Sequence, residues 1–502
     1  MQEPYKKISH GVIPKLERLK QAIEEVGALN SDVDLPFSFA ITSKTTRFGY
    51  LFPDLQTAAA LLPEVPETRD HLLSLGDSMM EPKGWFNSDS SIPSAYTYFG
   101  QFVDHDITFE AKSDDMVKLG DADFRVLTSE EIASKITNGR TPGLDLDNVY
   151  YKPAPRNCAR MVLGFVSSAA GGLLPGKAND LPRKPRSSTN KDDRAALIGD
   201  KRNDENLIIA QLHVAFLRAH NAIAARGHTF DEVRRILRRH YQWIVTRDFL
   251  PRICDPWIVS EILFGGNRVF RPNPDDLFMP FEFSVAAYRF GHSMVRPTYH
   301  YNSDFPKATL RDLFTLTALS GDLGGTLTLP EKWIIEWKNF VDGGANRARP
   351  IDTSLSRELF SLTEFKKPMP EARLSVRNLL RGYMLRLPTG QAVASALGLK
   401  VLKPEDIEAV ASSVSDGQLA AVRDGGFSER TPLWYYILAE AAAKSTGRLG
   451  PVGSTIVAEV LIGLIRGSKD SILREPGWKP TLGGTPGLFT LRDLLQLGNV
   501  LN

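Results

Sequence analysis

Three side chains that can hold or move a proton lie close together in residues 98–106. Gln101, Asp104 and His105 fall within five residues there, and their neighbours are mostly apolar or aromatic. An amide, a carboxylate and an imidazole are costly to bury unless each finds a polar partner. The pattern therefore indicates either a hydrogen-bonded pair in the core or a pocket in which the imidazole takes a proton from a small polar ligand.

A second charged group stands at the expected start of a helix. Residues 199–206 read Gly-Asp-Lys-Arg-Asn-Asp-Glu-Asn and come directly before the apolar run at 207–216. Acidic residues at a helix N-terminus offset the helix dipole. Arg202 and Glu205 are three residues apart, so they share one face if the first turn includes both. The segment fits an ordinary capped helix with an ion pair, or a cation and a carboxylate that face a ligand.

A third segment places one histidine among small and aromatic residues. His292 ends the run Ala-Ala-Tyr-Arg-Phe-Gly-His at residues 286–292. Gly291 would let a flat ring or another backbone approach closely, and a neutral imidazole is a common ligand that suits iron. A histidine that is hydrogen-bonded in the core is the alternative for this segment taken alone.

A fourth segment carries an asparagine and three arginines in an apolar helical frame. Residues 377–391 read Arg-Asn-Leu-Leu-Arg-Gly-Tyr-Met-Leu-Arg-Leu-Pro-Thr-Gly-Gln. A buried guanidinium needs an anion. A ligand with two carboxylates would supply it, and Asp or Glu side chains of the protein itself are the alternative.

The four segments form an ordered set of motifs along residues 96–473. They read Gly-Gln-x-x-Asp-His-Asp, Gly-Asp-x-Arg-x-x-Glu, Arg-x-x-His and Asn-x-x-Arg. Together they resemble the animal-type haem peroxidases, the superfamily that also contains cyclooxygenases and fatty-acid dioxygenases, with this chain as a bacterial-like member. The resemblance implies a mainly α, large single-domain fold with haem b in a central helical core.

The resemblance also implies the residues on the distal side of the haem. His105 matches the distal His, Gln101 matches a nearby Gln that contacts water or halide, and Arg202 matches the distal Arg that stabilises charge on the departing oxygen. Asp104 and Glu205 match the carboxylates that form ester bonds to haem methyl groups.

On the proximal side, His292 matches the iron ligand and Asn378 the residue that holds its other ring nitrogen. Arg289 and Arg381 match residues that face the haem propionates. One departure concerns Asn206, which stands where some mammalian members have a Met that forms a third haem link. We therefore expect no sulfonium link, and bromide, iodide or phenols as better donors than chloride.

Many family members also hold calcium close to the distal helix. Asp106 matches the calcium ligand that follows the distal His, and residues 141–147 resemble the second ligand loop. Thr141 and Asp145 match the Thr and Asp of that loop, while Asp147 stands where Ser is usual. Calcium takes six to eight oxygen ligands, which these side chains and nearby carbonyls could supply. A solvated acidic turn is the alternative.

The activity that the resemblance implies is reduction of hydrogen peroxide, with oxidation of halides (bromide, iodide) or small phenolic or aromatic donors through an oxoferryl intermediate. Three alternatives stay open: a fatty-acid dioxygenase of the same superfamily, a non-catalytic haem-binding or adhesion module, and an electron carrier with iron held by both His105 and His292. Cyclooxygenase-like members have a radical-forming Tyr three residues before the proximal His, where this chain has Arg289. Tyr288 is one residue earlier, which on a helix turns a side chain by about 100°, so we expect it to point away from an oxygenase channel.

Helical elements must position these residues. We expect buried or amphipathic helices at 204–226, 230–249, 285–295, 374–385 and 455–467, and little strand. His213 and His220 lie seven residues apart on the first of these, and we assign them to packing. The motif residues are spread from 101 to 381 without a low-complexity linker between them. This favours one catalytic domain over 96–502, wrapped by an N-terminal segment at 1–95.

Composition limits the partners without selecting a function. The net charge of +2 gives no electrostatic preference for nucleic acid or a membrane surface, and the two cysteines form no disulfide framework. The N-terminus lacks the apolar core of a signal peptide, and no uncharged apolar run reaches the roughly 18 residues of a transmembrane helix. We expect no nucleic-acid partner and no membrane span, and a cytoplasmic protein or one exported without an N-terminal signal.

Overall fold

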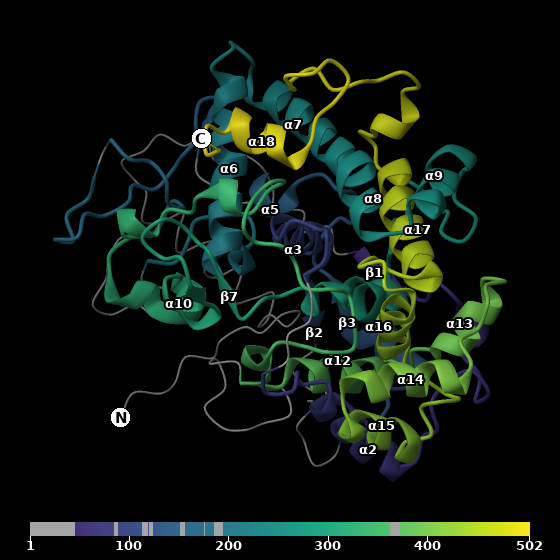
Figure 1. The fold of residues 1–502 in the computed structure, drawn as a ribbon. Helices are drawn as coiled ribbons and strands as arrows, with labels where there is room; N and C mark the ends of the chain where they lie inside the picture. The colour runs from purple at the N-terminus through teal and green to yellow at the C-terminus, as the bar shows by residue number, and fades with distance from the viewer. Residues whose placement is uncertain are drawn as a thin grey trace.

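The structure is a computed structural model that describes residues 46–84, 89–112, 119, 124–150, 156–174, 176–184, 194–361 and 372–501. These parts are mainly helical (Figure 1). The longer helices are α2 (Pro66–Ser78), α3 (Ala95–Ile107), α6 (Leu207–Ala224), α7 (Phe230–Ile244), α9 (Pro256–Gly265), α12 (Leu374–Met384), α14 (Pro404–Val414), α15 (Asp416–Asp424), α16 (Leu433–Lys444) and α17 (Pro451–Gly467). The shorter α-helices are α4 (Ser129–Lys135), α5 (Asp147–Tyr150), α8 (Leu250–Ile253), α10 (Leu310–Thr315), α11 (Ala318–Gly321), α13 (Gly390–Ala396) and α18 (Leu491–Leu497).

Most of the helices expected from the sequence are present. Those at 204–226, 374–385 and 455–467 correspond to α6, α12 and α17, and α7 continues into a π-helical turn, η3 (Val245–Phe249), to cover 230–249. The helix expected at 285–295 is present only as far as His292, and it is irregular. A π-helical turn, η4 (Glu282–Ala286), meets a 3₁₀ segment, η5 (Ala287–His292), and Ala286 between them leaves the helical backbone at φ −123° and ψ −73°. Such turns are frequent at functional sites.

Helix α3 lies in the centre of the molecule. It packs on α6, where the Phe102 ring stacks on Phe216 with centroids 4.3 Å apart, and Phe99 meets Phe249 edge-on at 5.4 Å. These four rings are fully buried, and burial of each stabilises the fold by about 1.5–3 kcal/mol. The apolar face of α3 is thereby fixed, and so is the direction of its polar side chains.

The start of α6 is fixed by side-chain caps. The Asn206 side chain accepts a hydrogen bond from Ile209 N at 3.0 Å. Just before it, the 3₁₀ turn η2 (Lys201–Asp204) begins at Asp200, whose carboxylate accepts from Arg202 N at 2.9 Å. Caps of this kind satisfy N–H groups that a helix start leaves without partners. They hold residues 200–206 against α3.

A small sheet connects the N-terminal part of the described chain to the segment that carries His292. Its order is β2 (Glu110–Lys112), β3 (Ile136–Asn138), β1 (Thr46–Gly49) and β6 (Met279–Pro280). Strand β1 is antiparallel to β3 and parallel to β6, with Phe48 opposite Met279. The remaining strands form two separate pairs, β4 (Arg156–Asn157) with β5 (Arg160–Met161) and β7 (Thr298–Tyr299) with β8 (Ala308–Thr309). The division at residue 95 stays a prediction, and residues 1–45 lie outside the described residues.

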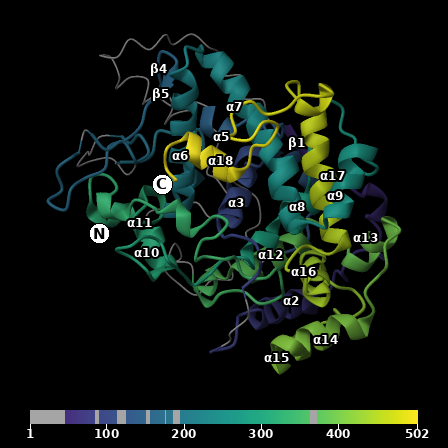
Figure 2. The ribbon, with the colours of Figure 1, turned by 45° about the horizontal axis from the view of Figure 1, so that its top comes forward.

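Figures 1 and 2 show how the elements are arranged in space. Helices α2, α12, α14 and α15 gather at one end and α6, α7 and α18 at the other, with α3 between them (Figures 1 and 2). Among the described helices, α6 alone is long and apolar enough to cross a membrane, yet 78% of it is buried in the protein. It is therefore no clear membrane span. His213 and His220 on α6 are buried, as expected from packing.

Candidate active site

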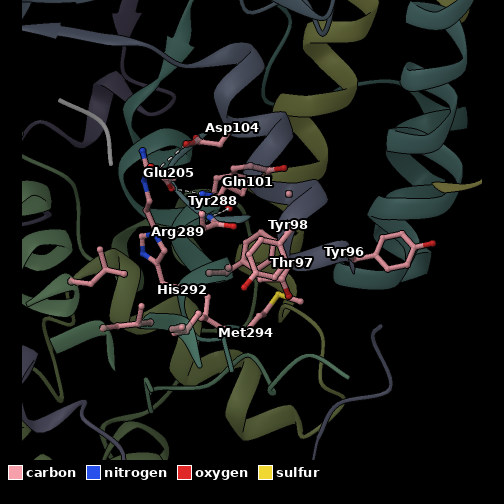
Figure 3. Close-up of a pocket in the computed structure, with 18 of the residues that line it drawn as sticks. Tyr96, Thr97, Tyr98, Gln101, Asp104, Glu205, Tyr288, Arg289, His292 and Met294 are labelled. Carbon is pink, nitrogen blue, oxygen red and sulfur yellow. Dashed lines mark hydrogen bonds and ion pairs between the residues drawn. The ribbon is translucent and has the colours of Figure 1, made fainter. Parts of the chain in front are cut away.

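A cavity of about 1160 Å³, counted with its open mouth, lies beside α3, η5 and α12 (Figure 3). Five of the predicted site residues line it: Gln101, Asp104, Glu205, Arg289 and His292. The rest of the wall is largely apolar and aromatic and includes Tyr96, Tyr98, Tyr288, Phe290, Met294, Val295, Leu310, Phe314, Leu359 and Leu374. Ligand sites commonly combine such a wall with a few converging polar groups.

The imidazole of His292 is held by the residue predicted for that task. Asn378 Nδ2 lies 2.8 Å from His292 Nδ1. A ligating histidine normally donates its second N–H to a partner that fixes the ring, and turning the Asn378 amide about χ2 presents its oxygen as that acceptor. With Nδ1 engaged, Nε2 is the atom that would hold a metal. The backbone that carries His292 is the irregular η4–η5 segment.

A linked group of three polar side chains and a separate ion pair occupy another part of the cavity. Gln101 Nε2 donates to the Glu205 carboxylate, and Asn206 Nδ2 donates to Gln101 Oε1 at 3.2 Å. The Asp104 carboxylate pairs with Arg289 at 3.3 Å. The structure therefore brings Asp104 and Glu205 to one cavity, although they are far apart in sequence, and Figure 3 shows both near Gln101.

His105 and Arg202 lie near this group but are not among the residues that line the cavity. His105 is fully buried, and its Nδ1 is 2.7 Å from Asn203 Oδ1. The Arg202 guanidinium donates to the Asp200 carboxylate and to Thr108 O, at 2.8 Å and 2.5 Å. Burial opposes the charge of Asp200, but Arg202 and Arg140 outweigh it and hold the pKa of this carboxyl well below its usual range. The Arg202 guanidinium is thus held beside the C-terminal end of α3.

One arginine differs from its implied position. Arg381 does not line the cavity, because the Glu110 carboxylate of β2 pairs with it. This is the internal-partner alternative that the sequence left open. Arg377, one turn earlier on α12, lines the cavity instead. Because residues 377 and 381 lie one turn apart on the same side of a helix, the sequence signal for a guanidinium at this wall was present but did not distinguish the two.

Tyr288 also differs from expectation, because it lines the cavity. The expected 100° rotation assumed a regular helix, and the 3₁₀ geometry of η5 places the ring otherwise. The ring stacks on Phe283 with centroids 4.7 Å apart and meets Phe290 edge-on at 5.6 Å. Burial raises the pKa of the Tyr288 phenol well above its usual value.

The predicted calcium residues gather next to α3. Burial, together with the neighbouring Asp147, raises the pKa of Asp106 to about 7, and burial with Asp147 and Asp106 raises that of Asp145 well above its usual range. Thr141 reaches the group through its backbone N–H, which bonds to Asp147. Within the described ranges, no three or more His, Cys, Asp or Glu side chains have the arrangement of a metal site, so calcium stays a prediction.

Comparisons with known proteins show what this chain is similar to. The animal haem peroxidase family model matches residues 125–320, which include Arg202, Glu205 and His292. A peroxidase-like protein of Margaritifera margaritifera is 26% identical over 258 residues, which cover 42% of this chain and 32% of that protein. Thyroid peroxidase of Mus musculus is 30% identical over 138 residues, which cover 24% of this chain and 15% of that protein. The chain therefore spans about a third or less of these relatives.

The fold agrees over a longer stretch. Peroxidase A from Dictyostelium discoideum superposes with a TM-score of 0.60 at 16% identity, over 88% of this chain and 90% of that one. This chain is similar to the animal haem peroxidases in sequence over residues 125–320 and in fold over most of its length. A fatty acid alpha-dioxygenase of Arabidopsis thaliana shares the superfamily's fold with it, at a TM-score of 0.56 and 12% identity over 88% of this chain and 75% of that one. The mainly helical fold expected from the sequence is confirmed.

The superfamily implies haem, and the cavity fits that group. Haem combines a flat apolar ring with two carboxylates and needs an axial ligand for its iron. The apolar and aromatic wall, His292 with Asn378 behind it, and the guanidinium groups of Arg289 and Arg377 match these three requirements. Asp104 and Glu205 add two carboxylates at the same wall.

Proposed function

We propose that this protein is a haem peroxidase that reduces hydrogen peroxide and oxidises halides or small phenolic donors. The observation that carries the proposal is the cavity in which His292, backed by Asn378, faces the same space as Gln101, Asp104 and Glu205. A core histidine of purely structural role would have no need of such a cavity. The proposal covers haem b as the cofactor and His292 as the residue that would hold its iron.

Haem, when bound, supplies the redox chemistry, and the side chains around it handle protons, charge and access. His105 is one helical turn beyond Gln101 on α3, so both lie on the same side of that helix. In the proposal His105 takes the proton of the incoming peroxide, and Gln101 holds the small polar ligand through its amide. Arg202 supplies positive charge where negative charge develops. Its ion pair with Asp200 fixes that charge on this side of α3.

Asp104 and Glu205 would form ester bonds to the haem. Each has a neutral or cationic partner at the cavity wall, Arg289 for Asp104 and the Gln101 amide for Glu205. These contacts engage Asp104 Oδ2 and Glu205 Oε1, and Thr108 Oγ1 donates to Asp104 Oδ1 at 3.0 Å. Asn206 caps α6 and donates to Gln101, so the position of the third link found in some mammalian members is taken by an amide. We therefore propose bromide, iodide and phenols as better donors than chloride.

Calcium belongs to the proposal as a structural ion. Burial raises the pKa of all three carboxylates, and neighbouring carboxylates raise the pKa of Asp106 and Asp145 further. A bound cation would favour the charged form of each. Asp106 follows His105 on α3, so a cation there would fix the end of the helix that carries the proposed proton acceptor.

The deciding experiment is a stopped-flow spectrum of the haem-loaded protein mixed with hydrogen peroxide. A rapid change of the haem spectrum, reversed by iodide or guaiacol, supports a peroxidase. His105→Ala should slow the change by roughly 10²–10⁴, the usual scale for a positioned proton-transfer group. A haem spectrum that does not change when peroxide is added would instead indicate a non-catalytic haem module or an electron carrier with two histidine ligands.

A second candidate, a fatty-acid dioxygenase, is favoured by the position of Tyr288. Its phenol lines the cavity next to Phe290, where a radical-forming tyrosine would have to lie. The test is oxygen uptake with an unsaturated fatty acid in the absence of added peroxide. Uptake that Tyr288→Phe abolishes, with haem content unchanged, would replace the peroxidase assignment. Tyr98→Phe, which removes another phenol from the same cavity, is the matched control.

A further inference from the structure

Asn203 lies between two buried imidazoles that belong to different helices. Its Oδ1 is 2.7 Å from Nδ1 of His105 on α3, and its Nδ2 is 2.9 Å from Nδ1 of His213 on α6. None of the three side chains has solvent-exposed surface. A chain of hydrogen bonds therefore runs from the middle of α6, through η2, to the residue proposed to take the peroxide proton.

An amide group fixes the roles of the two rings that it joins. It offers one acceptor, the oxygen, and one donor group, the NH₂. The two Nδ1 atoms must therefore play opposite parts, one donating and one accepting. With Oδ1 toward His105, Nδ1 of that ring carries the hydrogen and Nε2 has a lone pair; with Nδ2 toward His213, that ring carries its hydrogen on Nε2.

His213 is suited to the accepting part because it stays neutral. Burial lowers the pKa of its imidazole to about 3, so the ring stays neutral and one of its two nitrogens keeps a lone pair at any ordinary pH. Phe102 meets the His213 ring edge-on, with centroids 6.1 Å apart, and limits its rotation. The charged groups near the two rings are Asp200, which interacts with both, and the Arg202 and Arg140 guanidinium groups that pair with Asp200.

We infer that Asn203 and His213 are positioning residues that hold His105 in the tautomer with its lone pair on Nε2. The inference rests on the proposed function only in the use of that lone pair, which is to accept the proton of hydrogen peroxide. A histidine free to exchange tautomers would spend part of its time with a hydrogen where the lone pair is needed. The hydrogen bond to the Asn203 amide keeps His105 in the required tautomer before the ligand binds.

The test is nitrogen-15 NMR of the full chain labelled at histidine, without haem and then with haem, with His105→Gln used to assign the signals. In the wild type we expect His105 to carry its hydrogen on Nδ1. His213→Phe should release the amide and let His105 populate both tautomers, while His213→Gln should restore the wild-type state, because its side-chain oxygen can accept from Asn203. Asn203→Ala is the second route to the same loss if His213→Phe does not fold.

His220→Phe is the matched control. His220 also lies on α6 and is buried, but it bonds to Tyr150 and Ala159 and not to Asn203. It should leave the tautomer of His105 unchanged. In the haem-loaded protein, His213→Phe should slow the reaction with peroxide by roughly 10–100-fold, the scale for loss of a residue that orients a functional group, and leave the step with the donor unchanged. His213→Gln should recover most of the rate.

The inference is overturned if wild-type His105 carries its hydrogen on Nε2, or if both His213→Phe and Asn203→Ala leave its tautomer as it was. The NMR result does not depend on peroxide chemistry. If the tautomers are as expected and peroxide is not consumed, the inference on Asn203 and His213 stands and the proposed function fails.

Discussion

The buried carboxyl of Glu282 offers a quantitative test of how the proximal segment is held. Glu282 begins η4, the turn that leads toward His292, and its two carboxyl oxygens accept from Leu51 N at 2.8 Å and Phe52 N at 3.1 Å. The residue has no exposed surface. Burial raises its pKa from 4.5 to about 7, because it disfavours the charged form more than the two backbone N–H groups support it.

The pKa of Glu282 fixes the sign and size of its effect on stability. Since the folded protein holds the proton more tightly than the unfolded chain does, this group stabilises the fold fully below about pH 4.5, and that contribution is lost as the pH rises through about 7. One pKa unit corresponds to about 1.4 kcal/mol, so the loss is about 3 kcal/mol.

The perturbation is Glu282→Gln, which removes the titration and keeps the size of the side chain. The assay is urea unfolding of wild type and variant at several values between about pH 4 and pH 8. The free energy of unfolding of the wild type, less that of the variant, should fall by about 3 kcal/mol over this interval. Glu440→Gln is a second case of the same sign, since burial also raises the pKa of Glu440 to about 7. A difference for Glu282 that is flat or rises with pH would refute the reasoning.

Three further outcomes follow from the site. Asn378→Leu should weaken haem binding by roughly 10–100-fold in a titration followed by the haem spectrum, since the imidazole of His292 loses its orienting partner; Asn378→Asp keeps an acceptor and should retain most of the affinity. Peroxide-treated wild type should keep its haem in acidic acetone, whereas the double variant Asp104→Asn, Glu205→Gln should release it, and full release from wild type would contradict the ester bonds. Calcium at 100 times its dissociation constant should stabilise the wild type by about 2.7 kcal/mol in thermal unfolding after chelation and re-addition, and Asp145→Asn should show no such gain.

The local patterns of the sequence predicted the helices well and the irregular segment poorly. Apolar patterning indicated α6, α12 and α17, which are largely buried in the core. The same patterning suggested a regular helix around His292, where the chain instead forms η4 and η5. This segment follows β6, which pairs with β1, and it bonds to Leu51 and Phe52 through Glu282. These partners are remote in sequence and leave no local signal.

For the site, motif spacing identified which residues gather but not which way each side chain turns. Asp104, Glu205 and His292 line one cavity, as the ordered motifs suggested. Arg381 turns to Glu110, a partner that only the fold supplies. Asn203 had no motif to mark it, and its importance appears only when His105 and His213 are seen on either side of it.

The pairing of β1 with both β3 and β6 bears on the order in which the chain can fold during synthesis. As the chain is synthesised, β1 can pair with β3 early, but its other edge must wait for β6, and the bond from Leu51 to Glu282 spans 231 residues. Until then that edge is a strand without a neighbour, the kind of surface on which chains aggregate. The entropy of closing the long loop between β1 and β6 adds little to this delay, since each doubling of loop length costs only about 0.6 kcal/mol. The segment that carries His292 is synthesised well after β1 and β3, and Asn378 follows later still, so the site that would hold haem cannot be complete before residue 378 has been made.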